Sequence, residues 1–357
     1  MIIPNGGGLY ATGPRRLVFA GEAIVDVLMR VPALPPRGGD ALATSCEVTA
    51  GGGFNVMAAA ARQGLPATYA GGHGTGPWGD LVRAALGAEG IGLLRPPDQE
   101  RDTGFDVALV EPDAERTFVT HLGAEAVRGP APWDAVRAGP GDAVYVSGYG
   151  LVPPDSGPAL AQWASALPAG VLLFVDPGPL VAQIPAAVLD PVLARCDWLS
   201  CNYREAALLT NKGLSGAGAA AVPGGAGAAS PAGGAGVAGT AGGSGSAGTL
   251  GDPAELARRL LARGAAANVL VRAGAAGCYV ALFGSSSAVH VRAPAVTAVD
   301  STGAGDAHSG AFLAALADGL PPLDAAARAN AAAAFAVTRP GPATSPTRAE
   351  LDAWLRG

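Results

Sequence analysis

The chain has 357 residues, of which 49% are hydrophobic and 15% charged, and this suits a globular enzyme with one large α/β domain or two smaller ones. Its formal net charge of −6 offers no electrostatic basis for binding nucleic acid or a membrane surface. The cysteines form no Cys-x-x-Cys pair, residues 1–16 contain no apolar leader, and no apolar run is long enough to span a bilayer. We therefore expect a cytoplasmic protein with reduced thiols.

Two stretches near the amino terminus contain polar residues that are candidates for binding a ligand. Leu17–Gly21 is typical of a buried first strand, and Asp26 follows it in an apolar setting, where an acid is usually a turn or cap residue. Farther on, Gly51-Gly52-Gly53-Phe54-Asn55 opens a helical pattern that Gly64 ends. The glycines allow close approach to a ligand and Asn55 offers a donor and an acceptor, although an ordinary glycine-rich turn with an Asn cap fits as well.

Residues 27–48 and 103–120 contain short, loosely alternating strand-like pieces that interrupt the strand–helix series. In the second segment, Val107, Leu109 and Phe118 lie among polar residues. Two such interruptions predict a small sheet outside the main layer, although an edge hairpin fits the pattern equally well.

The turn Gly74-Thr75-Gly76-Pro77-Trp78-Gly79 matches the G-x-G-x-x-G fingerprint of dinucleotide sites and lies between a strand-like and a helix-like segment. However, Pro77 removes one of the amides that would face a pyrophosphate, and the turn is not in the first strand–helix unit. We therefore expect no nicotinamide dinucleotide to bind here.

Continuous apolar runs at 143–148, 171–176 and 269–272 are typical of strands with both faces covered. Helical patterns lie between them, and one is sharply bounded by Asp252 as N-cap and Gly264 at its end. Repeated strand–helix units predict right-handed crossovers and a mainly parallel, doubly wound α/β sheet flanked by helices.

Residues 213–250 consist almost entirely of Gly, Ala, Ser, Pro and Thr and carry no charge. Such a composition cannot bury enough apolar surface to order itself, which predicts a flexible insertion in a surface loop. Because the strand–helix series resumes after it, the insertion marks no domain boundary.

Asn202 and Glu205 begin a helical pattern directly after a strand-like segment. Their spacing suits a capping box, and it also puts both side chains on one face, where they could hold the water shell of a Mg²⁺ ion. The turn from Arg272 to Gly277 brings further glycines to the end of another strand, as a plain β-turn would also do.

The stretch Asp300-Ser301-Thr302-Gly303-Ala304-Gly305-Asp306 follows an extended apolar run at 295–299 and opens a helical pattern at 307–317 whose larger apolar residues share one face. Gly303 and Gly305 leave amides unobstructed at a helix start, where the helix dipole favours an anion. Asp306 adds a carboxylate, as phosphoryl transfer to a hydroxyl requires. A glycine-rich C-cap followed by an Asp N-cap explains the stretch equally well.

Asp300 to Ala307 resembles the carboxy-terminal signature of the ribokinase (PfkB) family of sugar kinases, D-T-x-G-A-G-D-x-F, with Ser301 where Thr is usual and His308 where Phe is usual. The turn at 51–55 resembles the amino-terminal signature of the same family. Apart from the insertion, the resemblance covers residues 17–350 and implies a ribokinase-like fold whose small β lid covers the sugar.

The resemblance also implies an activity, which is ATP-dependent phosphorylation of a primary hydroxyl of a small sugar or sugar-like molecule. Asp306 is implied as the general base, and Gly303, Ala304 and Gly305 as the turn that forms the anion hole with amides of Ala304, Gly305 and Asp306. The residues implied to bind substrate are Asp26, Gly51, Gly52, Asn55 and Asp306. Those implied to bind ATP are Asn202, Arg272, Gly274, Gly277, Gly305 and Asn330.

The same resemblance implies metal sites. Asn202 and Glu205 match an N-x-x-E motif that the family ties to Mg²⁺ and phosphate. Asp300, Gly341 and Ser345 resemble the family's loop for a monovalent cation such as K⁺, although Pro340 and Pro342 alter it. The sequence leaves open whether the lid also forms a homodimer.

Two other functions stay open. A nucleoside kinase of the same family shares all these motifs and needs aromatic or apolar lid residues, for which Phe105 and Phe118 are candidates. A sensor that binds sugar or nucleotide without turnover is the alternative from another class, but it has no need of Asp306.

Overall fold

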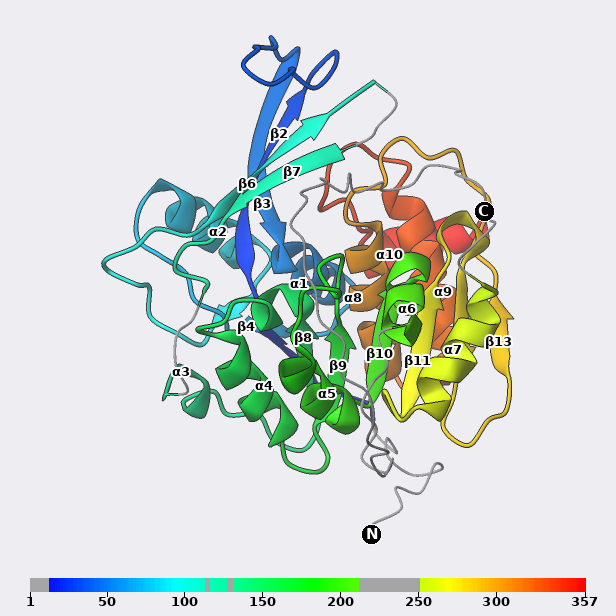
Figure 1. Cartoon of the computed structure of the whole chain (residues 1–357). Coiled ribbons are helices and arrows are strands. Elements are labelled where there is room, and N and C mark those ends of the chain that lie inside the picture. Colours follow the sequence, from blue (N-terminus) through cyan, green and yellow to red (C-terminus); the bar gives the residue numbers. More distant parts are fainter. Residues whose placement is uncertain (1–12, 113–115, 127–130, 212–250) are drawn as a thin grey trace, which may run out of the picture.

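The computed structural model describes residues 13–112, 116–126, 131–211 and 251–357, so the insertion predicted at 213–250 lies outside the described residues. Its centre is a nine-stranded sheet in which neighbouring strands from β11 to β5 run parallel, while β12 and β13 pair antiparallel at one edge (Figure 1). In sheet order the strands are β13 (Ala288–Val291), β12 (Cys278–Ala281), β11 (Asn268–Arg272), β10 (Trp198–Asn202), β9 (Leu172–Asp176), β8 (Asp142–Ser147), β1 (Arg16–Ala20), β4 (Ala67–Tyr69) and β5 (Gly92–Leu93).

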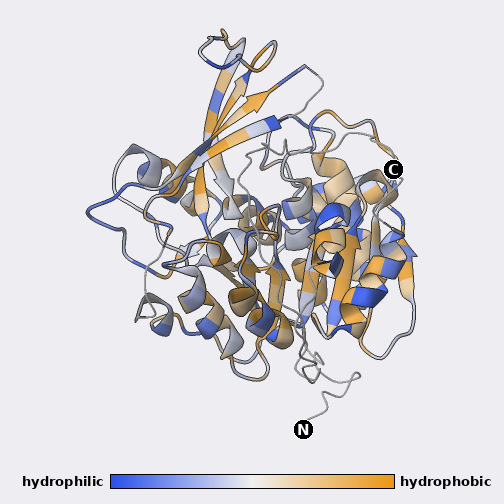
Figure 2. Ribbon diagram, viewed as in Figure 1, coloured by the Kyte–Doolittle hydropathy of each residue, from blue (hydrophilic) through white to orange (hydrophobic). Residues whose placement is uncertain are grey.

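Helices cover both faces of this sheet, which explains why its strands are continuously apolar. Along β8, for example, Val144 packs into one core and Tyr145 into the other, and Figure 2 shows much of the central strands in the hydrophobic colour. The helices on the Val144 side are α3 (Ala131–Asp134), α4 (Gly157–Ser165), α5 (Ala186–Arg195), α6 (Tyr203–Asn211) and α7 (Pro253–Ala262). Those on the Tyr145 side are α1 (Gly53–Arg62), α2 (Pro77–Ala88), α8 (Ala304–Ala317) and α9 (Pro322–Ala336).

The remaining helical elements are short or peripheral. Helix α10 (Arg348–Arg356) packs on α9 through an edge-to-face contact of Trp354 with Phe335. The 3₁₀ turns η1 (Gly148–Leu151) and η2 (Gly274–Ala276) follow β8 and β11. Within the described ranges, no helix is long and apolar enough to cross a membrane.

A second, four-stranded sheet projects from the body at the top of Figure 1 and corresponds to the segments predicted as the lid. Its order is β3 (Ser45–Gly52), β2 (Ala23–Arg30), β6 (Phe105–Val110) and β7 (Arg116–His121). The two strand-like segments therefore pair with each other outside the main layer, and the edge-hairpin interpretation is wrong. The lid begins earlier than the expected residue 27, because β2 starts at Ala23, and Asp26 consequently lies within the lid sheet.

Two local expectations need correction. The apolar run at 295–299 forms no strand, and Val299 is 60% exposed. Helix α8 begins at Ala304, earlier than expected, and is buried on all sides from Ala307 to Ala315. Small residues let neighbouring helices approach α8 closely enough to bury it. At Gly310, for example, a Cβ would lie 2.5 Å from the Val56 carbonyl oxygen of α1.

By contrast, the predicted start of α7 is confirmed, because the Asp252 carboxylate accepts a hydrogen bond of 3.2 Å from the Ala254 amide.

Candidate active site

Polar side chains gather where the parallel strands end, as expected for ligand sites in open α/β sheets. Glu22 follows β1, Ser147 ends β8, Asp176 ends β9 and Arg272 ends β11. The Ser147 hydroxyl donates to Glu22 at 2.8 Å, and the Arg272 guanidinium pairs with Asp176 at 2.7 Å. The first contact joins the ends of the neighbouring strands β8 and β1, and the second reaches from β11 across β10 to β9.

The turn that opens α8 leaves backbone amides free, as the predicted anion hole requires. Gly303 adopts a left-handed conformation with φ of 71°, which a side chain would disfavour. Within the described residues, the amides of Gly305 and Asp306 have no hydrogen-bond partner, whereas the Ala304 amide turns back to the Ser301 carbonyl at 3.3 Å. Two amides are therefore free at the start of this 14-residue helix, where three were expected for an anion hole.

Asp306 lies in the first turn of α8, next to these amides. Its Oδ2 accepts a hydrogen bond of 3.3 Å from Nδ2 of Asn55 in the first turn of α1, so the two signature motifs meet in space. Burial and the negative charge of Asp176 raise the pKa of Asp306 to about 7, although Asn55 and Arg272 oppose the rise. A carboxylate with this pKa is suited to accept a proton near neutral pH.

Asp26 is 8% exposed and projects from β2 toward the glycine turn. A Cβ on Gly51 would lie 2.0 Å from its carboxylate, so only glycine leaves room there, and Gly52 opens α1 with a positive φ of 58°. Burial, Asp106 and Asp306 raise the pKa of Asp26 to about 8. A turn or cap role is thus excluded, since Asp26 is a buried lid residue electrostatically coupled to Asp306.

Two acids that the sequence did not single out join this group. Asp106 of β6 pairs in register with Asp26, and its Oδ1 has no hydrogen-bond partner in the described part of the chain. Burial raises the pKa of Asp106 to about 6. Glu22 likewise has an unpartnered Oε2 among the described residues, and burial raises its pKa to about 8. Neither residue belongs to a motif, and strand register alone brings Asp106 to Asp26.

Arg272, expected on the nucleotide side, donates its hydrogen bonds within the protein. Its Nη1 contacts Asp176, Ser200 and Ser309 at 2.7, 3.2 and 3.1 Å, and Nη2 lies 3.8 Å from Glu205. A Cβ on Gly305 would lie 3.5 Å from its guanidinium carbon, so this buried cation sits beside the anion hole. A direct contact with ATP stays a prediction, whereas the charge beside Gly305 is part of the site.

Asn202 and Glu205 form the capping box. The Glu205 carboxylate accepts from the amide and from Nδ2 of Asn202, both at 2.7 Å, and Asn202 Oδ1 accepts from the Glu205 amide at 2.9 Å. Both carboxylate oxygens are therefore engaged, and Glu205 is 3% exposed. Because Mg²⁺ usually retains several waters, the exposed Asn202 fits a contact with its hydration shell better than Glu205 fits direct coordination.

The predicted nucleotide turn and Asn330 meet at one backbone atom. Asn330 Nδ2 donates to the Val291 carbonyl at 2.8 Å, and a Cβ on Gly277 would lie 2.2 Å from the same oxygen. Gly274 and Gly277 both have positive φ, of 57° and 99°. The structure thus brings the turn and α9 together, although Asn330 is only 3% exposed.

His308 replaces the usual apolar residue of the signature and lies close enough to the Asn330 side chain to be influenced by it. It is 3% exposed, stacks near Phe312, and its two ring nitrogens lack partners within the described ranges. Burial, together with the charge of Arg272, lowers its pKa to about 3. The neutral ring therefore fills the same apolar position as a hydrophobic side chain.

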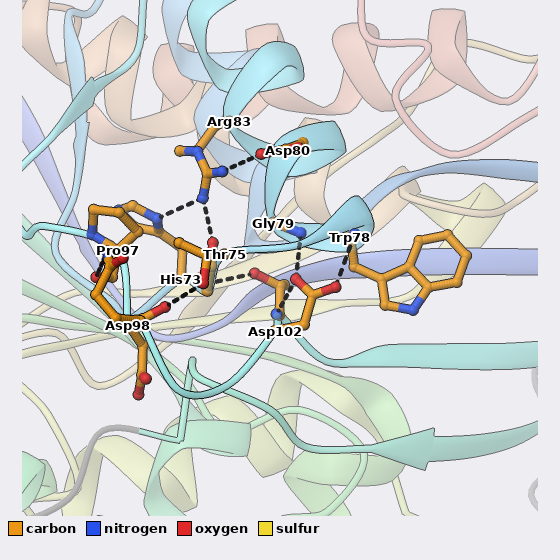
Figure 3. A network of polar contacts seen from close by, with 12 residues as sticks. His73, Thr75, Trp78, Gly79, Asp80, Arg83, Pro97, Asp98 and Asp102 are labelled. Atoms are coloured by element: carbon orange, nitrogen blue, oxygen red, sulfur yellow. Dashed lines mark hydrogen bonds and ion pairs between the residues drawn. The ribbon is translucent and has the colours of Figure 1, made fainter.

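The glycine-rich turn at 74–79 is filled by a side chain of the protein itself (Figure 3). The Asp102 carboxylate accepts from the Trp78 amide at 3.1 Å and from the Gly79 amide at 2.7 Å. A Cβ on Gly76 would lie 2.7 Å from that carboxylate. The amides that a pyrophosphate would need are thus already bound, which supports the expectation that no dinucleotide binds here.

Comparison with known proteins identifies the family of the chain. The sequence profile of the pfkB family carbohydrate kinases matches residues 14–349. The chain belongs to this family. It is 31% identical over 341 residues to the uncharacterized sugar kinase YegV of Escherichia coli (strain K12), a match that covers 95% of this chain and 94% of that protein. The chain is therefore a phosphotransferase of the carbohydrate kinase family.

Solved structures share the fold. Ribokinase from Cryptococcus neoformans var. grubii serotype A in complex with ADP superimposes with a TM-score of 0.73 and 21% identity, over 95% of this chain and 99% of that one. The nucleoside kinase of Burkholderia thailandensis in complex with inosine gives a TM-score of 0.70 and 19% identity, over 95% and 96%. Both likenesses confirm the ribokinase-like fold predicted from the sequence.

Proposed function

We propose that this kinase transfers the γ-phosphoryl group of ATP to a primary hydroxyl of a small sugar or sugar-like molecule. The observation that carries the proposal is the position of Asp306, a partly buried carboxylate beside the free amides of Gly305 and Asp306 itself. A base and an anion hole at one point are what the transfer requires.

Each residue then has a defined task. Asp306 accepts the proton of the acceptor hydroxyl while the oxygen of that hydroxyl bonds to the γ-phosphorus. The bond between the γ-phosphorus and ADP breaks, and ADP leaves. The amides of Gly305 and Asp306 donate to the migrating phosphoryl group, and the Arg272 charge beside Gly305 stabilises its negative charge. Asn55 holds the Asp306 carboxylate in place through its hydrogen bond of 3.3 Å.

We place the adenine nucleotide between the 274–277 turn and α9. Support comes from the meeting of Gly277 and Asn330 at Val291 and from the ADP named with the structurally similar Cryptococcus ribokinase. Asn202 would contact the water shell of Mg²⁺, and the ion would supply charge neutralisation of the phosphates.

The acceptor should be rich in hydroxyls and free of acidic groups. Glu22, Asp26 and Asp106 surround the acceptor side with carboxyl groups, two of which retain oxygens unpaired among the described residues. Such groups exchange hydrogen bonds with hydroxyls, and the Asp106 carboxylate, whose pKa of about 6 leaves it ionised near neutral pH, attracts an amine and repels a carboxylate or phosphate. Neutral sugars and amino sugars are therefore favoured over sugar acids and sugar phosphates.

A nucleoside acceptor is the second candidate, and one lid residue favours it. Phe118 is 51% exposed and pairs with Ala108, which lies on the same face of β6 as Asp106. Phe105 lies on the opposite face, packed between Trp78 and His121 at ring distances of 5.9 and 5.7 Å. Phe118 is thus the lid aromatic that could stack on a base.

The function is tested by incubating the purified chain with MgATP and a panel of pentoses, hexoses, amino sugars, sugar acids and nucleosides, while ADP release is measured. Release that depends on a neutral or amino sugar supports the main proposal, and release that depends on nucleosides alone supports the second. Absence of acceptor-dependent release across the panel would contradict both.

Replacing Asp106 with Asn should weaken acceptor binding without harming the fold. Asn replaces a hydrogen bond to a charged group, typically about 1.5–3 kcal/mol, with a neutral one of about 1 kcal/mol, so KM should rise by roughly 2- to 30-fold. The melting temperature should stay or rise, because a buried acid next to Asp26 is removed. Glu100→Gln, an exposed acid, is the control. A normal KM with a lower melting temperature would show that Asp106 is structural.

We further propose a homodimer through the outer face of the lid. Val48, Val27, Val107 and Val119 form one row across its four strands. Val48 and Val119 at the two edges are 45% and 68% exposed, whereas Val27 also packs against the core of the body. The row lies opposite the Asp26 face, so a second copy can cover it without closing the site. In light-scattering measurements Val119→Asp should give monomers, whereas Val289→Asp, at an exposed site on β13, should not. A monomeric wild type would contradict this proposal.

A further inference from the structure

Asp300, at the start of the signature, has both carboxylate oxygens bound by protein donors. Oδ1 accepts from the amide of Thr302 at 2.9 Å and from its hydroxyl at 2.6 Å. Oδ2 accepts from the Gly341 amide at 3.1 Å. These bonds tie the loop at 341 to the turn that carries the proposed anion hole. Asp300 makes one further strong interaction.

That interaction is an ion pair with Arg116 of the lid strand β7, whose Nη2 donates to Asp300 Oδ1. The two side chains are only 8% and 7% exposed, so the guanidinium and the carboxylate neutralise each other away from water. Residues of the lid and of the signature loop, including Leu28, Val110 and Gly341, line the small cavity around the pair. A cation from the lid thus lies at the Asp300 carboxylate.

The backbone acceptors of the loop are also occupied. Arg62 of α1 donates through Nη1 to the Ala343 carbonyl at 2.6 Å and to the Ser345 carbonyl at 3.0 Å. The Val337 carbonyl accepts from the amides of Val299 and Asp300 at 2.7 and 3.1 Å. The Ser345 hydroxyl is unpartnered within the described residues, but one hydroxyl cannot replace the hydration shell of a monovalent cation.

While Arg116 pairs with Asp300, the residues that resemble a monovalent-cation loop therefore do not fit such an ion. We propose that the Arg116 guanidinium takes its place, so that the turn at 303–305 is held in position without K⁺ and is tied to the lid. The guanidinium carries the same unit charge, cannot be deprotonated in a protein and cannot dissociate from the chain. Arg116 is thus a positioning residue that acts through Asp300.

The experiment compares thermal unfolding of the full chain in KCl and in N-methyl-D-glucamine chloride at equal ionic strength. The wild-type melting temperature should be the same in both salts. Arg116→Ala should melt lower and should regain several degrees in about 100 mM KCl, because K⁺ can then bind the exposed Asp300 carboxylate. Arg116→Lys keeps the charge and should remain insensitive to the cation.

Arg339→Ala, which removes an exposed arginine near the same loop, is the matched control and should show no difference between the salts. If Arg116→Ala does not fold in either salt, Arg116→Gln is measured in its place. The proposal would be overturned if K⁺ raised the melting temperature of the wild type, or if the melting temperature of a neutral variant at 116 did not respond to K⁺.

Turnover provides a second readout, which rests on the proposed kinase function. With an acceptor from the panel, wild-type kcat should differ by less than about twofold between the salts, whereas the neutral variant at 116 should gain several-fold from K⁺. If no acceptor is found, the proposed function fails but the thermal comparison still decides the role of Arg116.

Discussion

Asp306→Asn is expected to lower turnover by about two to four orders of magnitude while nucleotide binding and fold are retained, since this is the span that a general base contributes. Asn keeps the size and the hydrogen bond with Asn55 but cannot take the proton of the acceptor hydroxyl. The measurement is single-turnover phosphorylation together with ADP affinity by calorimetry. Asp324→Asn is a matched control, because Asp324 is an exposed acid in the first turn of the neighbouring helix α9.

The pH dependence separates a base from a structural acid. Because the pKa of Asp306 is raised to about 7 by burial and Asp176, wild-type kcat/KM should increase as pH rises through 7 and then level off. A raised pKa also means that the native state binds this proton more tightly than the unfolded state. The stability it contributes is therefore present at low pH and lost as pH rises toward 7, so Asp306→Asn should be more stable than wild type above pH 7. Near-normal turnover of the variant, or a flat wild-type profile, would remove Asp306 from the mechanism.

The sequence predicted those parts of the site that depend on local backbone geometry. Gly303 and Asp306 lie within one helix start, and Gly51, Gly52 and Asn55 within another, so a few adjacent residues determine the geometry of each proposed binding turn. The alternation of apolar runs and helical patterns likewise predicted the doubly wound sheet, because each run is buried on both faces.

What the sequence did not predict depends on partners far apart in the chain. Asp106 reaches Asp26 only through the register of β2 with β6, and Arg116 reaches Asp300 across 184 residues. Asp176 could have been noticed as an acid at the end of a buried strand, but its pairing with Arg272 could not. Long-range pairing is fixed by tertiary packing, so periodicity and motif spacing carry no signal for it.

The Arg272 network should be the most stability-sensitive polar feature of the site. Arg272→Met removes the guanidinium and leaves Asp176 and Glu205 buried without a counter-charge. Breaking a buried pair in this way typically costs about 3–5 kcal/mol of unfolding free energy. Arg259→Met, at an arginine that is 57% exposed and pairs with Glu255, should cost no more than about 0.5 kcal/mol. Denaturant unfolding measures the free energy of unfolding of the two variants. A loss in Arg272→Met as small as that in Arg259→Met would show that the network contributes little to stability.

A double variant then separates the structural role of this charge from its role beside the anion hole. Asp176→Asn combined with Arg272→Met removes both partners, so much of the lost stability should return, because an acid no longer lies unpaired next to Asp306. Phosphoryl transfer should not return with it, since the cation near Gly305 is still missing. The pKa of Asp306 distinguishes the structural role of Arg272 from its role beside the anion hole, because Arg272 lowers this pKa and Asp176 raises it. In Arg272→Met the midpoint of the pH profile should therefore move above that of the wild type, and in the double variant it should move back down. If activity recovered together with stability, Arg272 would be a purely structural residue.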